Sequence, residues 1–130
     1  MTTDRDANDY LAKALESLAS AESELAADRY NACMNRCYFA CFQAAVSALV
    51  REGIVSSHVK HTHMAVARDF NNHLIRRRKL YPERLASVLP RLVSLRHQAD
   101  YRPTSVGRGR ASAEVVAARD FVSQVASRAG

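Results

Sequence analysis

The segment from Asn35 to Val50 constrains the fold more than any other part of the chain. It contains neither glycine nor proline, its one charged residue is Arg36, and most of its remaining side chains are apolar. A segment of this kind is typical of a helix that is buried on nearly every side. Other segments must therefore pack around it.

Two features of this helix need neighbours. Arg29, Arg36 and Gln43 are spaced by seven residues and so form one polar stripe, and a polar group buried there without a partner would cost about 1 to 3 kcal/mol. Small residues also recur every four positions, which lets a neighbouring backbone approach closely and, we expect, favours a homodimer. They are Cys33, Cys37, Cys41 and Ala45 in one row and Ala40, Ala44 and Ala48 in the next.

Length and composition indicate a single domain over residues 1–130 with a core of its own. No apolar run approaches the roughly 20 residues of a membrane span, and the first residues, Met1 to Asp6, show no basic stretch followed by an apolar one. The three cysteines lie in one expected helix, which does not indicate a disulfide framework. We therefore expect a cytoplasmic protein that contacts no membrane.

The net charge of +6 is unevenly distributed, because residues 1–28 carry −5 and residues 29–130 carry +11. A basic body behind an acidic first helix could attract nucleic acid or an acidic partner surface. The alternative is a soluble, arginine-rich protein with no such ligand, and charge alone does not separate the two.

Apolar periodicity predicts five helices and no strand, as an all-α, antiparallel up-and-down bundle of four to five helices. Asp6 is the expected first N-cap, Gly53 the left-handed residue that ends the second helix, and Pro90 a kink in the fourth. The expected helices are Asp6–Leu25, Asp28–Glu52, His61–Lys79, Pro82–Tyr101 and Ser112–Ser127.

Four of these helices carry an apolar face that we expect to point inward. The faces consist of Leu11, Leu15, Leu18 and Leu25; Val66, Phe70 and Leu74; Leu85, Leu89, Leu92 and Leu95; and Val115, Ala118, Val122 and Val125. The third helix ends in Arg76-Arg77-Arg78-Lys79. These cations either complement the negative end of the helix dipole or contact phosphate groups.

Two clusters resemble metal sites at first sight. Cys33, Cys37 and Cys41 share a helix face, and His58-x-x-His61-x-His63 lies in the linker after the second helix. Neither has companion ligands nearby in the sequence, so we interpret the cysteines as small buried apolar side chains and expect no metal and no cofactor. A phosphate-binding glycine loop, a Ser-His-Asp pattern and a carboxylate pair are also missing.

The end of the fourth helix carries a second set of polar residues. Arg96 and Asp100 are four residues apart and so lie on one face, where they can pair with each other or with the polar stripe of the second helix. Our hypothesis is that Asp100 pairs with Arg36, because each is an isolated charge that needs a counter-ion.

Arg36-Cys37-Tyr38-Phe39-Ala40-Cys41-Phe42-Gln43-Ala44-Ala45 resembles the Arg-x-Tyr-Tyr-Ala-x-Phe-His-Ala-Ala helix of the HEPN domains (higher eukaryote and prokaryote nucleotide-binding). Phe39 and Gln43 stand where that family usually has Tyr and His. Further matches follow in order and, with the first, cover about four-fifths of the chain. They are Thr62-His63 ahead of Val66, Phe70 and His73, then Arg96-x-x-Ala99-Asp100-Tyr101, and an alanine-rich last helix.

The resemblance implies a helical bundle that dimerises and is often encoded beside a small nucleotidyltransferase as a toxin–antitoxin pair. Many such domains are metal-independent ribonucleases, in which Arg-x4-6-His motifs of two subunits act on a ribose 2′-hydroxyl and the scissile phosphate. Here Tyr101 follows Arg96 where an Arg-x4-His motif would place histidine. Arg91 and His97 have five residues between them, but that offset splays the two side chains apart on a helix.

Two interpretations follow. In the first, the chain binds RNA or a nucleotide without cleaving RNA, and a nucleotidyltransferase partner adenylylates Tyr101, a residue that could instead be a structural cap. In the second, it is a homodimeric RNA-cleaving toxin in which Arg96 binds phosphate and His97 or His63 carries the proton. The departure from the motif favours the first. The polar cleft would be lined by Arg36, Gln43, His63, Asp100 and Tyr101.

Overall fold

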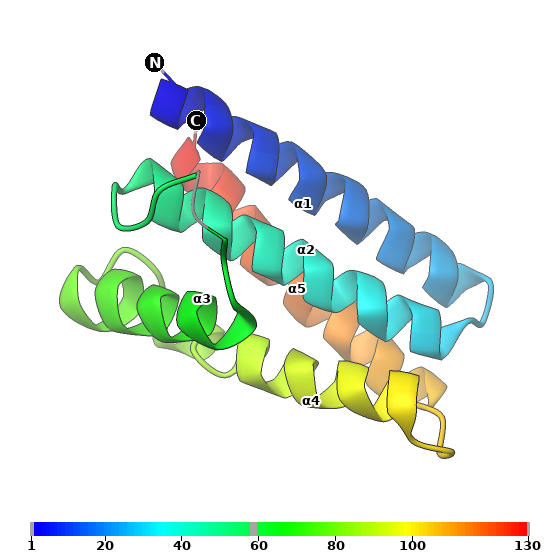
Figure 1. Cartoon of the computed structure of the whole chain (residues 1–130). Helices are drawn as coiled ribbons and strands as arrows, with labels where there is room; N and C mark the ends of the chain where they lie inside the picture. Colours follow the sequence, from blue (N-terminus) through cyan, green and yellow to red (C-terminus); the bar gives the residue numbers. More distant parts are fainter. Residues whose placement is uncertain (1, 58–59, 130) are drawn as a thin grey trace.

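The central element of the computed structural model is α2, Tyr30–Arg51, which lies among the other helices (Figure 1). The structure describes residues 2–57 and 60–129. The remaining elements are α1, Thr2–Ala26; α3, His63–Asp69; the π-helix η1, Phe70–Arg77; the 3-10 helix η2, Glu83–Leu85; α4, Val88–Tyr101; and α5, Arg108–Ala129. Within those ranges there is no strand, and the expected all-α bundle is confirmed.

Chain direction alternates through α1, α2, α4 and α5, while α3 and η1 are inserted between α2 and α4 (Figure 1). α2 contacts α1, α3, α4 and α5, and the two termini lie at the same end of the bundle. Its buried residues include both rows of small side chains. The prediction that other segments wrap this helix is therefore confirmed. None of the helices in the described ranges is long and apolar enough to cross a bilayer.

Small side chains of α1 are buried where it meets α2, because Ala7, Ala14 and Ala21 are fully buried. Of the four leucines that we expected to point inward, Leu18 is buried and Leu11 and Leu25 pack against the core, whereas Leu15 is 48% exposed. Ser47 Oγ on α2 donates a hydrogen bond of 2.6 Å to the backbone carbonyl of Ala7. Such a close approach of two backbones leaves no room for large side chains. The small-residue rows thus serve packing inside one chain, and they do not supply the dimer surface for which we invoked them.

Several helix boundaries differ from the expected ones for local reasons. Asp6 is not an N-cap, because α1 begins at Thr2. Asp28 has φ 63° and Arg29 N donates to Glu24 O at 2.9 Å, so the turn at the end of α1 delays the start of α2 to Tyr30. Gly53, with φ 72°, follows the end of α2 as predicted.

The third and fourth expected helices are each divided. The third begins at His63 and changes at Phe70 from α to π geometry, although its expected inward residues Val66, Phe70 and Leu74 are buried. The fourth opens as a 3-10 turn, and Pro90 is the third residue of α4. Because backbone N–H groups in the first helical turn have no intrahelical partner, proline is accommodated there and the kink predicted in mid-helix does not arise.

Candidate functional site

The buried ring of Tyr38 lies where α2, α3 and α4 meet. Its hydroxyl forms a hydrogen bond with Nδ1 of His63, and the two rings contact each other edge to face with centroids 5.1 Å apart. The guanidinium carbon of Arg96 on α4 lies 5.3 Å from the centre of the Tyr38 ring. Burial raises the pKa of Tyr38, so its hydroxyl stays protonated near neutral pH. Three helices thus contribute one side chain each to this cluster.

His63 is held at the start of α3 by the residue before it. Thr62 is the N-cap of α3, and its side chain accepts a hydrogen bond of 3.2 Å from Ala65 N. Burial lowers the pKa of His63, and the positive charge of Arg96 lowers it further. The imidazole is therefore neutral near pH 7, a state in which it can accept a proton.

Two guanidinium groups lie over the ring of Phe39. Arg36 is 5.1 Å and Arg96 5.0 Å from its centre. Cation–π attraction holds both groups, but it does not neutralise them. Asp100 Oδ2 lies 3.5 Å from Arg96 Nε without forming a hydrogen bond, and that buried Nε has no other partner. A buried donor without an acceptor costs free energy, so Arg96 is paired in charge with Asp100 but lacks the hydrogen bond that a buried Nε usually makes.

The hypothesis that Arg36 pairs with Asp100 is wrong. Arg36 donates from Nε and Nη2 to Asn35 Oδ1 at 3.1 and 2.7 Å, while Asp100 pairs with Arg96 one helical turn away. Arg36 reaches an acceptor in its own helix, so a partner from α4 is not required. Even so, Arg36 and Asp100 line the same depression of about 420 Å³, formed between α1, α2 and α4.

Gln43 belongs to the contact between α1 and α2 and is not among the residues that line that depression. In the orientation that satisfies its neighbours, its amide nitrogen donates to Ser17 Oγ at 2.7 Å and to the backbone carbonyls of Lys13 and Phe39 at 3.0 and 3.1 Å. The partner that we expected a buried polar group on α2 to need is thus supplied by α1. Gln43 has a structural role.

His97 and Tyr101 lie together on the outer face of α4. Their ring centroids are 4.9 Å apart, and Tyr101 is 73% exposed. In the described part of the chain, no hydrogen bond or ring contact joins either residue to Tyr38 or His63. The site therefore divides into an inner cluster, which consists of Arg36, Tyr38, Phe39, His63 and Arg96, and an outer pair, His97 and Tyr101.

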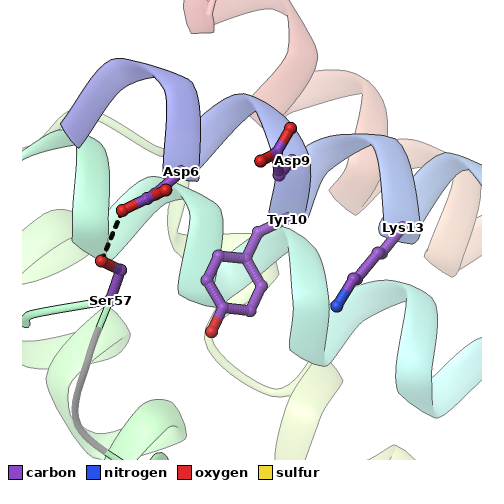
Figure 2. Close-up of a pocket in the computed structure, with 5 residues that line it drawn as sticks. All are labelled: Asp6, Asp9, Tyr10, Lys13 and Ser57. Carbon is purple, nitrogen blue, oxygen red and sulfur yellow. Dashed lines mark hydrogen bonds between the residues drawn. The ribbon is translucent and has the colours of Figure 1, made fainter. Parts of the chain in front are cut away.

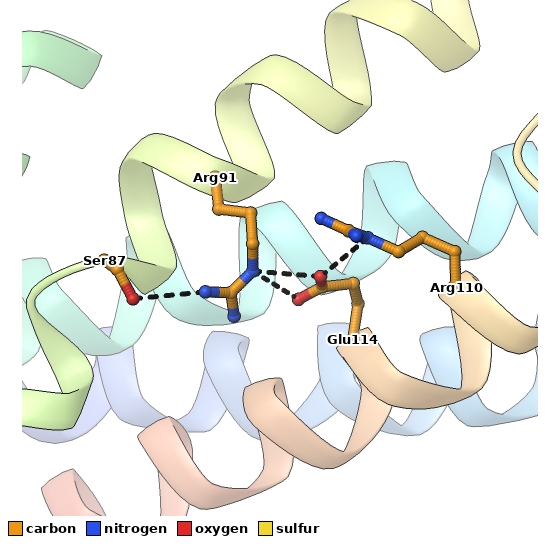
Figure 3. A network of polar contacts seen from close by, with 4 residues as sticks. All are labelled: Ser87, Arg91, Arg110 and Glu114. Atoms are coloured by element: carbon orange, nitrogen blue, oxygen red, sulfur yellow. Dashed lines mark hydrogen bonds and ion pairs between the residues drawn. The ribbon is translucent and has the colours of Figure 1, made fainter.

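Arg91, the other arginine upstream of His97, is bound to α5 (Figure 3). Its Nε donates to both carboxylate oxygens of Glu114 at 3.1 and 2.9 Å, and its Nη1 donates to Ser87 Oγ at 3.1 Å. Arg110 Nε lies 3.1 Å from the same carboxylate. The Glu114 side chain is 4% exposed, so this network fastens α4 to α5. Because Arg91 is bound to Glu114 and Ser87, we do not propose that Arg91 and His97 form a site together.

A depression near the start of α1 was not foreseen from the sequence (Figure 2). It is lined by Asp6, Asp9, Tyr10, Lys13 and Ser57, and Ser57 Oγ donates to Asp6 Oδ2 at 2.6 Å. That hydrogen bond ties the linker after α2 to α1. In the described ranges no three His, Cys, Asp or Glu side chains are arranged to hold a metal, and His58 of the linker lies outside those ranges.

Tyr38 is the site residue that sequence reasoning missed. It was part of the motif that resembled the HEPN helix, but nothing in the local pattern distinguished it from the other apolar residues of α2. The signal that could have found it is its hydroxyl, because a tyrosine on a helix expected to be buried on nearly every side needs a hydrogen-bond partner.

Comparison with known proteins agrees with this architecture. A family model described as HEPN domain matches residues 7–127. No curated protein matches the chain at a significant level. The match extends from α1 to α5 and includes every residue of the inner cluster.

Proposed function

The chain belongs to the HEPN domain family, and we propose that it is the RNA- or nucleotide-binding member of a toxin–antitoxin-like pair with a nucleotidyltransferase. The family indicates a function connected with nucleotides or RNA. The finer proposal rests on the inner cluster defined by Arg36, Tyr38, Phe39, His63 and Arg96.

The proposal depends on the position of the Arg96 guanidinium. Its guanidinium lies over two aromatic rings, and its buried Nε has no hydrogen-bond acceptor. Planar guanidinium groups bind phosphate through paired hydrogen bonds, and aromatic side chains provide faces on which bases stack. The Arg96 side chain is 28% exposed, so a phosphate oxygen can reach its guanidinium, and it would offset the repulsion between Arg36 and Arg96.

Binding of a labelled RNA oligonucleotide and of ATP tests the site. We expect Arg96→Gln to weaken binding at least about tenfold, the equivalent of one charge-assisted contact. Arg119→Gln is the matched control, because Arg119 is an exposed arginine in an ion pair with Glu22 on another face. Equal affinities of the Arg96→Gln protein and the wild type for both ligands would remove the cluster as the binding site.

In this proposal the nucleotidyltransferase partner modifies Tyr101. Its side chain is exposed on α4, so another enzyme can reach its hydroxyl. In adenylylation the phenolic oxygen would attack the α-phosphate of ATP, lose its proton and release pyrophosphate. Incubation with the nucleotidyltransferase and ATP should add one adenylyl group by mass spectrometry, and Tyr101→Phe should abolish the addition. A modified Tyr101→Phe protein would place the modification elsewhere.

A second function, a homodimeric metal-independent endoribonuclease, is favoured by one specific observation. His63 is neutral near pH 7 and lies beside the cation Arg96, so a proton acceptor and a phosphate-binding group are adjacent. The exposed apolar residues Val93 and Tyr101 on α4 and Val116 on α5 offer surface for a second copy.

Purified protein incubated with total RNA and a chelator decides between binding and cleavage. Cleavage that is lost in His63→Ala would establish the enzyme with His63 as proton carrier, and cleavage lost only in His97→Ala would assign that role to the outer pair. Intact RNA with a folded sample would leave the binding function. Light scattering at micromolar concentration tests the dimer, and a monomer would exclude any site shared between subunits.

A further inference from the structure

Together α3 and η1 run from the inner cluster toward the end of the bundle that carries both termini (Figure 1). A second group of cations lies at the end of η1. Arg76 and Lys79 line a depression of about 410 Å³ together with Ile75, Tyr81 and Glu83. Arg128, in the last turn of α5, lies 5.7 Å from the centre of the Tyr81 ring. Segments almost fifty residues apart thus bring their positive charges to one tyrosine.

The local charge is not balanced by the protein. Within the described residues, no carboxylate forms an ion pair with Arg76, Arg77, Lys79 or Arg128, whereas Arg78 pairs with Glu52 at 3.5 Å. Glu83 is the acidic side chain among the residues that line the depression. Cations held this close repel one another, a cost that a bound polyanion would reverse.

The end of η1 is capped in part by the backbone that follows it. Two of its last carbonyl groups already accept backbone hydrogen bonds, His73 O from Arg78 N at 3.1 Å and Leu74 O from Leu80 N at 2.8 Å. Lys79 lies beyond the helix with φ 53° and is exposed. Backbone donors therefore do part of the capping for which such a run of cations is the usual structural explanation.

We propose that Arg76, Arg77 and Lys79 form a second contact for the phosphate backbone of the RNA that the inner cluster binds. The proposal rests on the proposed function and narrows its ligand to a polymer. From His63 to Arg77 the chain is one continuous helical element, and at 1.5 Å per residue its ends are at most about 20 Å apart. At about 3.4 Å per nucleotide a stacked strand of roughly six nucleotides spans that distance, which a mononucleotide cannot do.

The salt dependence of binding tests this contact. The probes are fluorescein-labelled oligouridylates of about twelve and about three nucleotides, and the variant is Arg76→Gln/Arg77→Gln/Lys79→Asn in the full chain. Asparagine is chosen at position 79 because it tolerates the left-handed conformation. Since each phosphate contact contributes about 0.7 to the slope for single strands, we expect the slope of log K against log salt to fall by about 2 for the longer RNA.

At about 0.1 M salt that change corresponds to a loss of about 100-fold in affinity for the longer RNA, while the three-nucleotide probe binds as it does to the wild type. Arg5→Gln/Lys13→Gln/Arg108→Gln is the matched control, because it removes the same charge from exposed side chains on α1 and at the start of α5. The control should keep the wild-type slope.

Three results would overturn the proposal. One is a triple variant that binds the longer RNA with the wild-type slope, which would show that these cations do not contact the RNA. Another is an equal loss in the control, which would show that only the total charge matters. The third is that Arg96→Gln loses affinity for both probes while the triple variant keeps its affinity for both. That result would keep the proposed function and remove the second contact. If the wild type binds neither probe, the RNA-binding part of the proposed function fails together with the second contact, and ATP binding alone tests the inner cluster.

Discussion

The network around Glu114 gives a prediction that can be worked from the structure. The Glu114 side chain is 4% exposed, and its carboxylate is held by Arg91, which is 32% exposed, and by Arg110, which is 51% exposed. Removing one partner of a buried ion pair costs about 3 to 5 kcal/mol when the remaining charge stays buried. Because Arg110 remains and reaches solvent, we expect Arg91→Met to lie at the lower end, about 3 kcal/mol.

The reverse change leaves a different residue unpaired. Glu114→Met should cost about 1 to 2 kcal/mol, because the guanidinium of Arg91 can turn toward water. The double substitution Arg91→Met/Glu114→Met should lie within about 1 kcal/mol of the wild type, since apolar side chains of similar volume often replace a buried ion pair without loss. The two single effects are thus expected to be strongly non-additive.

Urea unfolding followed by far-ultraviolet circular dichroism measures all four proteins. The chain is a small single domain, for which two-state analysis is appropriate when the slope against urea is shared by the variants. Arg84→Met is a comparison for an exposed pair, because Arg84 binds Asp120 bidentately at 2.8 and 3.0 Å yet is 58% exposed, and it should cost less than about 1 kcal/mol. An Arg91→Met cost equal to that of Arg84→Met, or additive single effects, would refute the reasoning.

Three further outcomes are expected. The pKa of His63 is lowered in the folded state, so at a pH below the ordinary value of 6.5 the unfolded state binds more protons than the folded state. The wild type should therefore lose stability relative to His63→Gln as the pH falls through 6.5, and urea midpoints measure that loss. Ala44→Leu should destabilise by about 1 to 3 kcal/mol in thermal unfolding, because Ala44 is fully buried at a close helix contact. Cys33, Cys37 and Cys41 are fully buried, so a thiol reagent should label none of them until the chain unfolds, and rapid labelling of the native protein would contradict the packing around α2.

Much of the fold could be predicted because the pattern that specifies it is local. The apolar circumference of α2, the inward faces of η1 and α5, and the left-handed Gly53 follow from residues a few positions apart. Leu15 marks the limit of that approach. Ranking residues by size found Leu18, but it wrongly included Leu15 and left out Ala7, Ala14 and Ala21, which are buried where α1 closely approaches α2.

The site was predicted less completely than the fold. The sequence indicated that Arg36, His63, Arg96 and Asp100 are polar groups in need of partners. It offered the pair of Arg96 with Asp100, which the structure shows, as one of two alternatives. It could not choose between them, because a partner on another helix depends on how far each helix is rotated and shifted along its neighbour. A change of one residue in that offset moves a side chain to another face.

The sequence alone indicated an all-α bundle around one buried helix and a resemblance to the HEPN domains. Only the tertiary structure decided that Tyr38 meets His63, that Arg96 rather than Arg36 faces Asp100, and that Arg91 is bound to Glu114. The physical reason is the range of each effect. Helical periodicity is written within a few residues, whereas hydrogen bonds and ion pairs between helices form within about 3 Å and depend on packing of the whole chain.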